Sequence, residues 1–526
     1  MNLATVLTRT SAQMPDRVAL RLGEATFSYR ELDDASARVA AFLESRSIGA
    51  GDRVGVMLPN VPEFAAVYFG VLRAGAVVVP LNPLLKAREV AYHLTDSEAR
   101  LAFAWHAAAT EATLAAATVG AEVVEIHPAT FLDILTRHTP SENVADRGAD
   151  DTAVILYTSG TTGRPKGAEL THGSLLRNAE VVQSDLVQLE PDDVVFGGLP
   201  LFHSFGQTCT LNVAMAAGAT LALLPRFDAQ TAVAVLGTTK ATVFAGVPTM
   251  YSAFLALPEP PDLPDLRVCI SGGAALPVEV LHRFEERFGC QVLEGYGLSE
   301  TSPVASFNRL GRDRKPGSIG KPVTGVELQV VDDDGRPLGI GDVGEIAIRG
   351  HNVMKGYWRK PDETAAVLGA DGWFRTGDVG KADEDGYYFI LDRKKDLVIR
   401  GGFNIYPSEI EEVLYEHAAV ADAAVVGVPH PELGEEVAAV ITLKPATKAT
   451  EDELRDFVKR QVAPYKYPRV VRIVDALPKG PTGKILKTEI RLSIGSEPTT
   501  RPRVRTRAGT TRAPATTSHA GQPTAA

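Results

Sequence analysis

Short β-branched runs that end in glycine-rich polar loops constrain the fold of this chain more than any other feature. Five segments from about residue 150 have this form, each followed by a helical pattern: "TAVILYTSG", "DVVFGGLPLFHSFG", "ATVFAGVPTM", "RVCISGGAALP" and "QVLEGYGLSE". Strands that alternate with helices predict a largely parallel sheet. Ligands bind at the carboxyl ends of such strands, where these loops lie. One loop alone is explained equally well as a turn, but their repetition favours a binding site.

The length and charge of the chain limit its class. Its 526 residues are too many for one hydrophobic core, so at least two domains are expected. The net charge of −11 gives no general attraction to nucleic acid or anionic lipid. An anionic ligand must therefore be met by local cations, by Mg²⁺ or by helix N-termini.

The cysteines and the N-terminus indicate a cytoplasmic protein. Cys209, Cys269 and Cys290 form neither a metal-ligand pattern nor a disulfide framework, which favours a reducing compartment. The first residues lack the basic start and apolar core of a secretory signal. The weakly polar stretch 211–224 is too short and too interrupted to span a bilayer.

The second half of the chain has a different pattern. From about Asp332, short strands with turn signals predict a small antiparallel region. The charged run "DRKKD" (392–396) is predicted to be a solvated turn, with a hinge as its other role. Beyond it, Ser408 and Glu411 form a predicted capping box at the start of a helix. "AAVVGVP" and "EVAAVITL" are predicted to be strands.

These patterns together predict an α/β fold. A large N-terminal domain (1–391) is expected to contain mixed and parallel sheets flanked by helices, with the small antiparallel region closing it. A small α+β C-terminal domain follows (392–495). The last residues (496–526) carry five arginines, one acid and little apolar surface, which predicts a disordered basic tail. Its arginines are too dispersed to favour a nucleic-acid-binding arm.

The stretch "YTSGTTGRPKGAELTHGS" (157–174) is suited to holding phosphate. Lys166 takes the lysine position of the P-loop pattern, but Pro165 and Gly167 replace its glycine and its hydroxyl residue. Proline has no N–H to donate to a phosphate, so a P-loop NTPase is disfavoured. Lys166 and a set of hydroxyl residues remain suited to a leaving pyrophosphate: Thr158, Ser159, Thr161 and Thr162.

The same stretch resembles the phosphate-loop signature of the adenylate-forming (ANL) superfamily, which contains acyl-CoA synthetases, carrier-protein adenylation domains and beetle luciferases. Seven further motifs follow in the order of that family: "PLFHSFG" (200–206), "SGGAALP" (271–277), "EGYGLSETSP" (294–303), "GEIAIRG" (344–350), "GWFRTGD" (372–378), "DRKKDLVIRGGFNIYPSEIE" (392–411) and "PKGPTGKILK" (478–487). The resemblance covers about residues 10 to 492 and is strongest to bacterial fatty-acid–CoA ligases.

The resemblance implies a two-step reaction with ATP, Mg²⁺ and coenzyme A. A carboxylate attacks the α-phosphate of ATP to give an acyl-adenylate and pyrophosphate, and the thiol of CoA then displaces AMP. Two like charges about 4 Å apart repel by roughly 4 kcal/mol at a surface-like dielectric, so the first step needs a cation. Lys484 is the implied cation, although outside its motif it would be interpreted as a solvated surface lysine.

The resemblance also assigns the other residues of the site. Glu300 would carry Mg²⁺, which prefers hard oxygen ligands, although it would otherwise be interpreted as a helix start. Thr301 would contact the α-phosphate, and His203 would separate the nucleotide from an acyl tunnel that includes 245–251. Asp378 would accept both ribose hydroxyls. The implied nucleotide- and CoA-binding residues are Thr158, Ser159, Gly160, Thr161, Thr162, Lys166, Gly272, Gly273, Ala274, Gly295, Tyr296, Gly297, Asp378, Arg393, Gly401 and Gly402.

In the family that these motifs resemble, the small C-terminal domain is mobile and swings about the position of Asp392. The swing would remove Lys484 and bring Gly401 and Gly402 to the adenylate, where glycine lets the pantetheine arm approach the backbone. A hinge inside a solvated turn would disrupt no packing. Arg393 would assist from the hinge side, with a structural ion pair as its other interpretation.

Three functions remain open from the sequence. The first is a medium- to long-chain fatty-acid–CoA ligase with small-molecule substrates. The second is the same catalyst acting on aryl or short acids, or loading a separate carrier protein. The third is an inactive adenylate-binding scaffold, which the intact charged residues disfavour. Ile399 stands where luciferases carry lysine, so light emission is disfavoured. The stretch "PKGPTGK", which contains Lys484, also resembles the sequence around lysines that are acetylated in this family. A homodimer and a transient contact with a membrane surface are left open.

Overall fold

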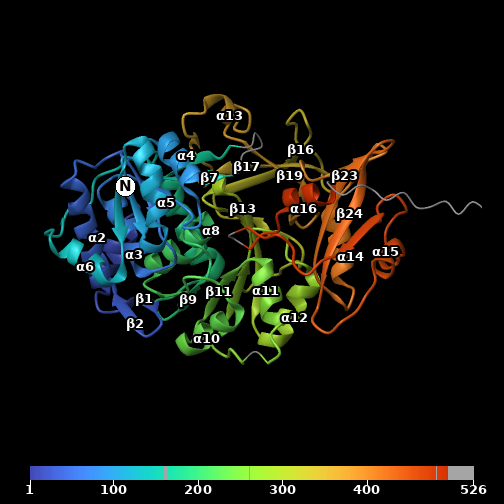
Figure 1. Cartoon of the computed structure of the whole chain (residues 1–526), viewed down its shortest axis with the longest axis horizontal. Coiled ribbons are helices and arrows are strands. Elements are labelled where there is room, and N and C mark those ends of the chain that lie inside the picture. The colour runs from blue at the N-terminus through green and yellow to red at the C-terminus, as the bar shows by residue number, and fades with distance from the viewer. Residues whose placement is uncertain (159–163, 260, 481–482, 496–526) are drawn as a thin grey trace, which may run out of the picture.

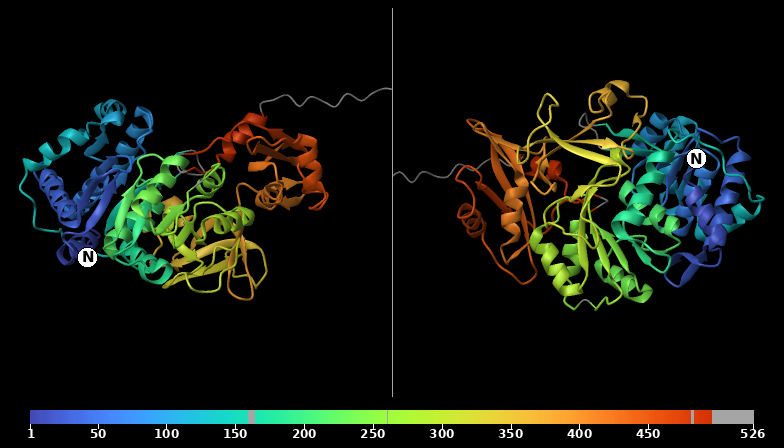
Figure 2. Two further views of the ribbon diagram at one scale, coloured as in Figure 1. Left: turned by 90° about the horizontal axis from the view of Figure 1, so that it is seen from below. Right: turned by 180° about the vertical axis from the view of Figure 1, so that it is seen from behind.

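The computed structural model describes residues 1–158, 164–259, 261–480 and 483–495. The predicted tail 496–526 lies outside this range. The N-terminal region (blue) and the C-terminal region (orange to red) stand at opposite ends of the molecule (Figures 1 and 2). The middle of the chain (green to yellow) lies between them.

A seven-stranded sheet forms much of the N-terminal region, in the order β18-β8-β7-β4-β3-β5-β6. Strands β3 to β7 are parallel where they pair, whereas β8 and β18 are antiparallel additions. The bounds are β3 Arg53–Met57, β4 Val77–Pro80, β5 Leu101–Trp105, β6 Glu122–Ile126, β7 Thr152–Thr158, β8 Lys166–Thr171 and β18 Gly356–Tyr357.

A nine-stranded sheet lies beside it, in the order β15-β14-β13-β12-β11-β9-β10-β1-β2. Its central strands are parallel, and β2, β14 and β15 are antiparallel. The bounds are β1 Val18–Leu22, β2 Ala25–Ser28, β9 Val194–Gly197, β10 Thr220–Leu223, β11 Val243–Gly246, β12 Val268–Ser271, β13 Gln291–Gly297, β14 Val304–Phe307 and β15 Lys321–Pro322.

The predicted repeating units are confirmed as strands, but they do not share one sheet. The "TAVILYTSG" unit is β7 of the seven-stranded sheet, and the other four units lie in the nine-stranded sheet. The loop after β7 returns directly as antiparallel β8, with no crossover helix to continue a parallel series. The predicted binding loops therefore come from two sheets.

Helix α3 (Pro62–Arg73) packs between the two sheets and contacts β3 and β4 on one side and β1 on the other. All its residues except Glu63 are buried, which matches its almost uninterrupted apolar sequence. Proline at its first turn fits the start of a helix, where an N–H has no intrahelical partner.

The remaining helices pack against the sheets and against one another. Their bounds are α1 Thr5–Gln13, α2 Tyr29–Glu44, α4 Ala87–Ser97, α5 Ala109–Val119, α6 Pro128–Thr136, α7 His172–Val181, α8 Ser204–Gly206, α9 Val213–Ala217, α10 Ala229–Thr239, α11 Pro248–Leu255, α12 Val278–Phe288, α13 Pro361–Ala365, α14 Pro407–Tyr415, α15 Glu451–Lys459 and α16 Lys487–Gly495. Short 3₁₀ or π turns are η1 His106–Ala108, η2 Val182–Val187, η3 Gln207–Asn212 and η4 Ser299–Thr301.

The predicted antiparallel region is confirmed as a four-stranded sheet, β16-β17-β19-β20. Its strands are β16 Val326–Val331, β17 Gly344–Gly350, β19 Phe374–Ala382 and β20 Tyr388–Arg393. The turn in "DRKKD" covers only 394–396, because Asp392 and Arg393 belong to β20. The predicted hinge position is therefore inside a strand and buried, not in a solvated turn.

The C-terminal region contains a five-stranded sheet, β22-β21-β24-β23 with β25 added beside β24. Its strands are β21 Val398–Arg400, β22 Phe403–Ile405, β23 Val420–His430, β24 Gly434–Leu443 and β25 Val470–Ile473. Its apolar residues form two core clusters separate from those of the N-terminal region. The predicted strands "AAVVGVP" and "EVAAVITL" are β23 and β24, which confirms the α+β pattern.

The predicted capping box at Ser408 is wrong. Helix α14 begins at Pro407 and has no side-chain cap. The hydroxyl of Ser408 donates instead to the carbonyl of Leu391, and its N–H donates to Asp392 Oδ2 at 3.1 Å. Because Ser408 bonds to residues of the preceding strand β20, its side chain does not cap helix α14.

The three cysteines are free and buried. Cys269 and Cys290 nevertheless lie together, with 3.3 Å between their Sγ atoms. Within the described ranges, no helix is long and apolar enough to cross a membrane.

Candidate active site

The site begins where the antiparallel sheet meets the end of β13. The hydroxyl of Tyr296 donates to Asp378 Oδ2 at 2.6 Å, and Arg393 Nε lies 3.0 Å from Asp378 Oδ1. Asp378 and Arg393 are paired residues of β19 and β20, so the sheet itself sets their contact. Asp378 is buried, and both its oxygens are bonded to neighbours that were themselves predicted as nucleotide-binding residues.

The charges of this cluster reinforce one another. The carboxylate of Asp378 raises the pKa of Arg393, although burial opposes the shift. Burial, followed by the charge of Asp378, holds the pKa of Tyr296 well above its usual value. Tyr296 is therefore a stable donor, and Arg393 a stable cation, at physiological pH.

Lys484 comes to this cluster from the C-terminal region. Thr249, in α11, donates its hydroxyl to the carbonyl of Gly483 at 3.1 Å. Gly483 has a φ of +78°, and a Cβ there would lie 2.6 Å from Thr249 Oγ1, so this close approach requires glycine. The N–H of Gly480 donates to the carbonyl of Lys484 at 2.8 Å and fixes the loop beyond it.

The ammonium of Lys484 lies among charged groups of both regions. Solvent reaches its side chain. Desolvation by the surrounding protein, followed by the charge of Arg393, nevertheless lowers the pKa of Lys484 to about 8, while Asp378 opposes the shift. The ammonium of Lys484 therefore loses its proton more readily than that of a free surface lysine, and it titrates close to physiological pH.

His203 directly precedes α8 and lies within electrostatic range of Lys484. Burial and the neighbouring Lys484 charge lower the pKa of His203 to about 4. The imidazole is therefore neutral at pH 7 and adds no second positive charge beside Lys484. The next aromatic residue, Phe205, has its ring 3.3 Å from where a side chain on Gly272 would begin.

The predicted adenine-binding segment, Gly272 to Ala274, follows β12. Its neighbour across the site is β13, which carries Tyr296. Gly273 is exposed with a φ of +80°, a conformation that favours glycine. At Gly297 a side chain would overlap the carbonyl of Pro303, so close packing alone explains that glycine.

The phosphate end lies where the two large sheets meet. Thr158 and Lys166 are paired residues that close the β7–β8 hairpin. Glu300 Oε1 accepts from Thr158 Oγ1 at 3.2 Å and from the hydroxyl of Tyr357 at 3.0 Å. Four predicted loop residues lie outside the described range: Ser159, Gly160, Thr161 and Thr162.

Thr301 is fully buried beside Glu300. Its hydroxyl accepts from the N–H of Leu298 at 2.9 Å and lies 2.6 Å from the carbonyl of Pro303. A hydroxyl contact with a phosphate would have to replace one of these bonds. The predicted role of Thr301 stays a prediction.

Gly401 and Gly402 form the turn between β21 and β22, away from the cluster around Asp378 in the sheet order. Their φ values are +56° and +84°, which glycine adopts without strain. Both are exposed, and the N–H of Gly401 donates to the carbonyl of Leu433 at 2.8 Å. The structure thus brings Lys484 to the site and leaves this glycine turn outside it.

Two contacts of the site were not predicted. Thr249 lies in the segment 245–251, which was predicted to line an acyl tunnel and not to contact the Lys484 loop. Tyr357 is far in sequence from Glu300 and lies in no pattern that predicts their contact. The only hint at Tyr357 was its place after Gly356 in an aromatic "GYW" stretch.

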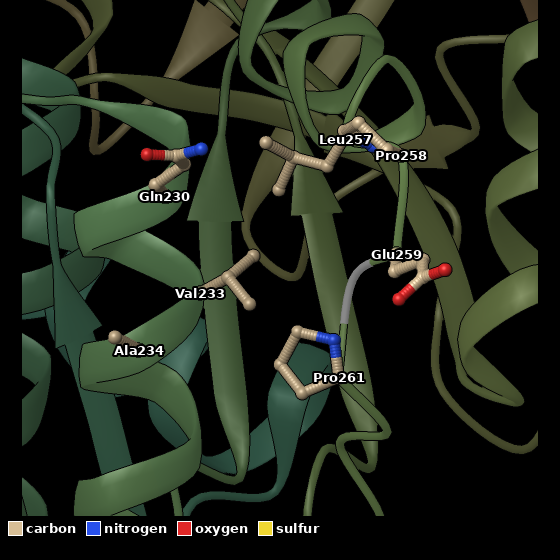
Figure 3. Close-up of a pocket in the computed structure, with 7 residues that line it drawn as sticks. All are labelled: Gln230, Val233, Ala234, Leu257, Pro258, Glu259 and Pro261. Atoms are coloured by element: carbon tan, nitrogen blue, oxygen red, sulfur yellow. The ribbon is translucent and has the colours of Figure 1, made fainter.

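A surface hollow of about 300 Å³ lies apart from this site, between α10 and the segment after α11 (Figure 3). Val233 of α10 faces Leu257 across it, and Gln230 lies above Val233. No predicted site residue lines it, so it carries no part of the predicted chemistry.

Comparison with family models gives two matches. Residues 7–358 match the model described as AMP-binding enzyme, and residues 409–484 match the model described as AMP-binding enzyme C-terminal domain. The first match contains the phosphate end of the site and Tyr357, and the second ends at Lys484.

Similar proteins cover nearly the whole chain. A long-chain-fatty-acid–CoA ligase of Bacillus subtilis (strain 168) is 38% identical, over 93% of this chain and 94% of its own length. A feruloyl-CoA synthase of an Amycolatopsis species is also 38% identical, over 93% of this chain and 98% of its own length.

Solved structures of one relative, MatB from Rhodopseudomonas palustris, exist in two states. The ATP-bound form has a TM-score of 0.88 at 36% identity, over 94% of this chain and 99% of that one. The apo form has a TM-score of 0.78 over the same shares. The arrangement described above, with Lys484 at the cluster, is thus more similar to the ATP-bound form.

Proposed function

The chain belongs to the AMP-binding enzyme family and is an AMP-forming acid–CoA ligase that works through an acyl-adenylate; we propose that its acid is a medium- to long-chain fatty acid. ATP and CoA are its other substrates. The products would be acyl-CoA, AMP and pyrophosphate.

One observation carries the assignment of the first step. The loop bearing Lys484 is seated against Thr249, so that its ammonium comes within electrostatic range of Asp378, Arg393 and His203. A carboxylate and an α-phosphate repel each other, and a cation between them lowers that barrier as charge develops. Lys484 would supply this cation, and neutral His203 would face the acyl chain.

Asp378 would hold the ribose of ATP, with Arg393 beside it and Tyr296 against the adenine. The phosphates would lie toward Lys166 and the 158–162 loop. Glu300 fits a magnesium ligand, because it is a buried carboxylate oriented through Oε1 by two hydroxyl donors. Among the described residues no cluster of three metal-binding side chains occurs, which suits an ion held mainly by phosphate and water oxygens. Bound Mg²⁺ would neutralise charge on the pyrophosphate as it leaves.

For the second step we propose that residues 392–495 move as a unit about Asp392. The movement would withdraw Lys484 and bring Gly401 and Gly402 to the adenylate. The movement must then break the bond from the hydroxyl of Ser408 to the carbonyl of Leu391 and the pairing of Asp392 and Arg393 with β19, because these contacts join the moving unit to the large domain. Large domain 1–391 would stay fixed.

Support for a fatty acid comes from the similarity to the Bacillus relative and from the largely apolar segment 245–251, which is proposed to line the acyl tunnel. The feruloyl-CoA synthase is equally similar, and this favours aryl acids as the second candidate. The three free, buried thiols fit a cytoplasmic enzyme.

A series of straight-chain acids tests the proposal in a CoA-dependent assay of AMP release. Each buried methylene contributes roughly 0.8 kcal/mol, about fourfold in kcat/KM. Rising kcat/KM up to a length cutoff supports a fatty-acid tunnel. Preference for ferulate or benzoate would replace it with the aryl alternative, and pyrophosphate release without any dependence on acid would exclude both.

A further inference from the structure

The segment 354–358 connects the two halves of the phosphate end. The N–H of Met354 donates to the carbonyl of Glu300 at 2.8 Å. The N–H groups of Lys355 and Trp358 donate to the carbonyls of Glu169 and Gly167, at 2.9 and 2.7 Å. The segment is therefore held to the residue predicted to bind Mg²⁺ and to the strand that begins with Lys166.

The side chain of Tyr357 contacts both Glu300 and Lys166, the first through its hydroxyl and the second through its ring. Its hydroxyl donates to Glu300 Oε1 at 3.0 Å. Its ring lies under the ammonium of Lys166, with 5.1 Å from Nζ to the ring centroid, within the range of a cation–π contact. One side chain thus contacts both the carboxylate of Glu300 and the ammonium of Lys166.

The backbone at Tyr357 is held rigidly. Tyr357 pairs with Ala168 of β8, and its N–H donates to Thr364 Oγ1 at 2.9 Å. The next residue, Trp358, donates its indole N–H to the carbonyl of Asp96 in α4 at 3.0 Å. Bonds to three different elements fix the backbone, so the ring has little freedom to leave Lys166.

Two hydroxyl groups meet at one oxygen of Glu300. The hydroxyl of Tyr357 donates to Oε1 at 3.0 Å, and Thr158 donates to the same oxygen at 3.2 Å. Within the described ranges, both of these bonds fall on Oε1 and not on Oε2, so they fix the orientation of the carboxylate.

We propose that Tyr357 is the positioning residue of the phosphate end: its hydroxyl orients Glu300 toward the metal ion of metal–ATP, and its ring places Lys166 for the phosphates. This inference rests on the proposed function, because it takes nucleotide and metal as the ligands. It assigns a role to a residue outside the predicted site motifs.

Two variants distinguish the contact of Tyr357 with Glu300 from its contact with Lys166. Tyr357→Phe keeps the ring under Lys166 and removes the donor to Glu300. Tyr357→Leu removes both contacts. Tyr388→Phe is the matched control, because Tyr388 is also half-buried and donates its hydroxyl at 2.6 Å, but to Leu328 in the antiparallel sheet.

The test measures binding without turnover. Each full-length variant is saturated with a non-hydrolysable ATP analogue, and Mn²⁺ binding is followed by the loss of the free-ion EPR signal. A hydrogen bond to a charged acceptor is strong enough that Tyr357→Phe should weaken Mn²⁺ binding about tenfold. Its affinity for the metal-free analogue in EDTA should stay within about twofold of wild type.

Tyr357→Leu should lose Mn²⁺ affinity to the same extent and also bind the metal-free analogue about threefold more weakly, as expected for a lost cation–π contact. Tyr388→Phe should match wild type in both measurements. Thermal unfolding of all three variants shows whether any loss follows stability alone.

The inference is overturned if Tyr357→Phe binds Mn²⁺ as wild type does, if the Phe and Leu variants are indistinguishable, or if the losses follow the unfolding temperature. Failure of the proposed function is separate. If wild-type enzyme binds the analogue and Mn²⁺ but forms no acyl-CoA from any acid, the fatty-acid assignment is wrong. That result would not affect the proposed role of Tyr357.

Discussion

The hydroxyl of Thr249, in the large N-terminal region, donates to the carbonyl of Gly483 in the C-terminal region at 3.1 Å. This bond immediately precedes Lys484 and holds the lysine loop near the cluster that is proposed to bind the nucleotide. It connects the arrangement of the two regions to the first chemical step.

Thr249→Val keeps the shape of the side chain and removes the donor. Loss of one neutral hydrogen bond is expected to slow adenylate formation about three- to tenfold, measured by pyrophosphate–ATP exchange. Thioester formation from supplied acyl-adenylate should stay within about twofold. Thr220→Val, which removes a hydroxyl donor to the carbonyl of Val18, is the control. Equal losses in both steps would contradict a role specific to this arrangement.

The lowered pKa of Lys484 predicts a pH dependence. Its charged form is the active one, and a pKa of about 8 in the free enzyme means that charge is lost as pH rises through that value. The kcat/KM for ATP in adenylate formation should therefore fall above about pH 8. Lys484→Arg stays charged and should lose the fall, whatever its absolute rate. A fall that persists unchanged in Lys484→Arg assigns the titration to another group.

Asp392→Pro tests the hinge. Proline fixes φ in β20 and removes the carboxylate that accepts from Ser408, so the strand should no longer reorient. Adenylate formation should stay within a few-fold, and thioester formation should fall at least about tenfold. Asp392→Ala removes the same carboxylate without fixing φ and should carry out both steps. The hinge assignment is falsified if the proline variant loses both steps equally.

Substitutions at Asp378 and at Tyr296 should change the affinity for ATP in different directions. Asp378→Asn removes the charge paired with Arg393 and should weaken ATP binding at least about tenfold by calorimetry. Tyr296→Phe frees Asp378 Oδ2 for the ribose, so ATP affinity should stay the same or rise up to about threefold. A large loss of affinity in Tyr296→Phe would show that the hydroxyl itself holds the nucleotide.

Gly402→Ala places a side chain at a φ of +84°, which costs about 1–2 kcal/mol for an L-residue. Thioester formation should decline while pyrophosphate–ATP exchange persists. Gly386→Ala, at a φ of +78° in the β19–β20 turn, has the same backbone cost and should leave both steps unchanged. Matching kinetics in the two variants would remove Gly402 from the CoA path.

The sequence predicted local structure well where a pattern is local. The apolar runs before the polar loops became β7, β9, β11, β12 and β13 at almost their predicted places. Their division between two sheets could not be predicted, because strand partners are chosen by packing between distant segments. The contact between Tyr357 and Lys166 escaped prediction for the same reason.

The hinge region shows how tertiary contacts override a local pattern. Five consecutive charged residues indicate solvent, yet Asp392 is buried because β20 continues through it and its carboxylate accepts from Ser408. The same contact removed Ser408 from its predicted cap. The roles that the motifs assign to the candidate residues stay predictions, and the contacts among those residues came only from the fold.

Helix α3 has a consequence for how this protein can evolve and move. Wedged between the two large sheets with scarcely a residue facing water, it makes them a single stiff block, since shear of one sheet past the other would open voids on both sides of it. Substitutions in α3 are therefore expected to lower stability before they alter turnover, and the proposed domain movement would take place at the junction between β20 and α14.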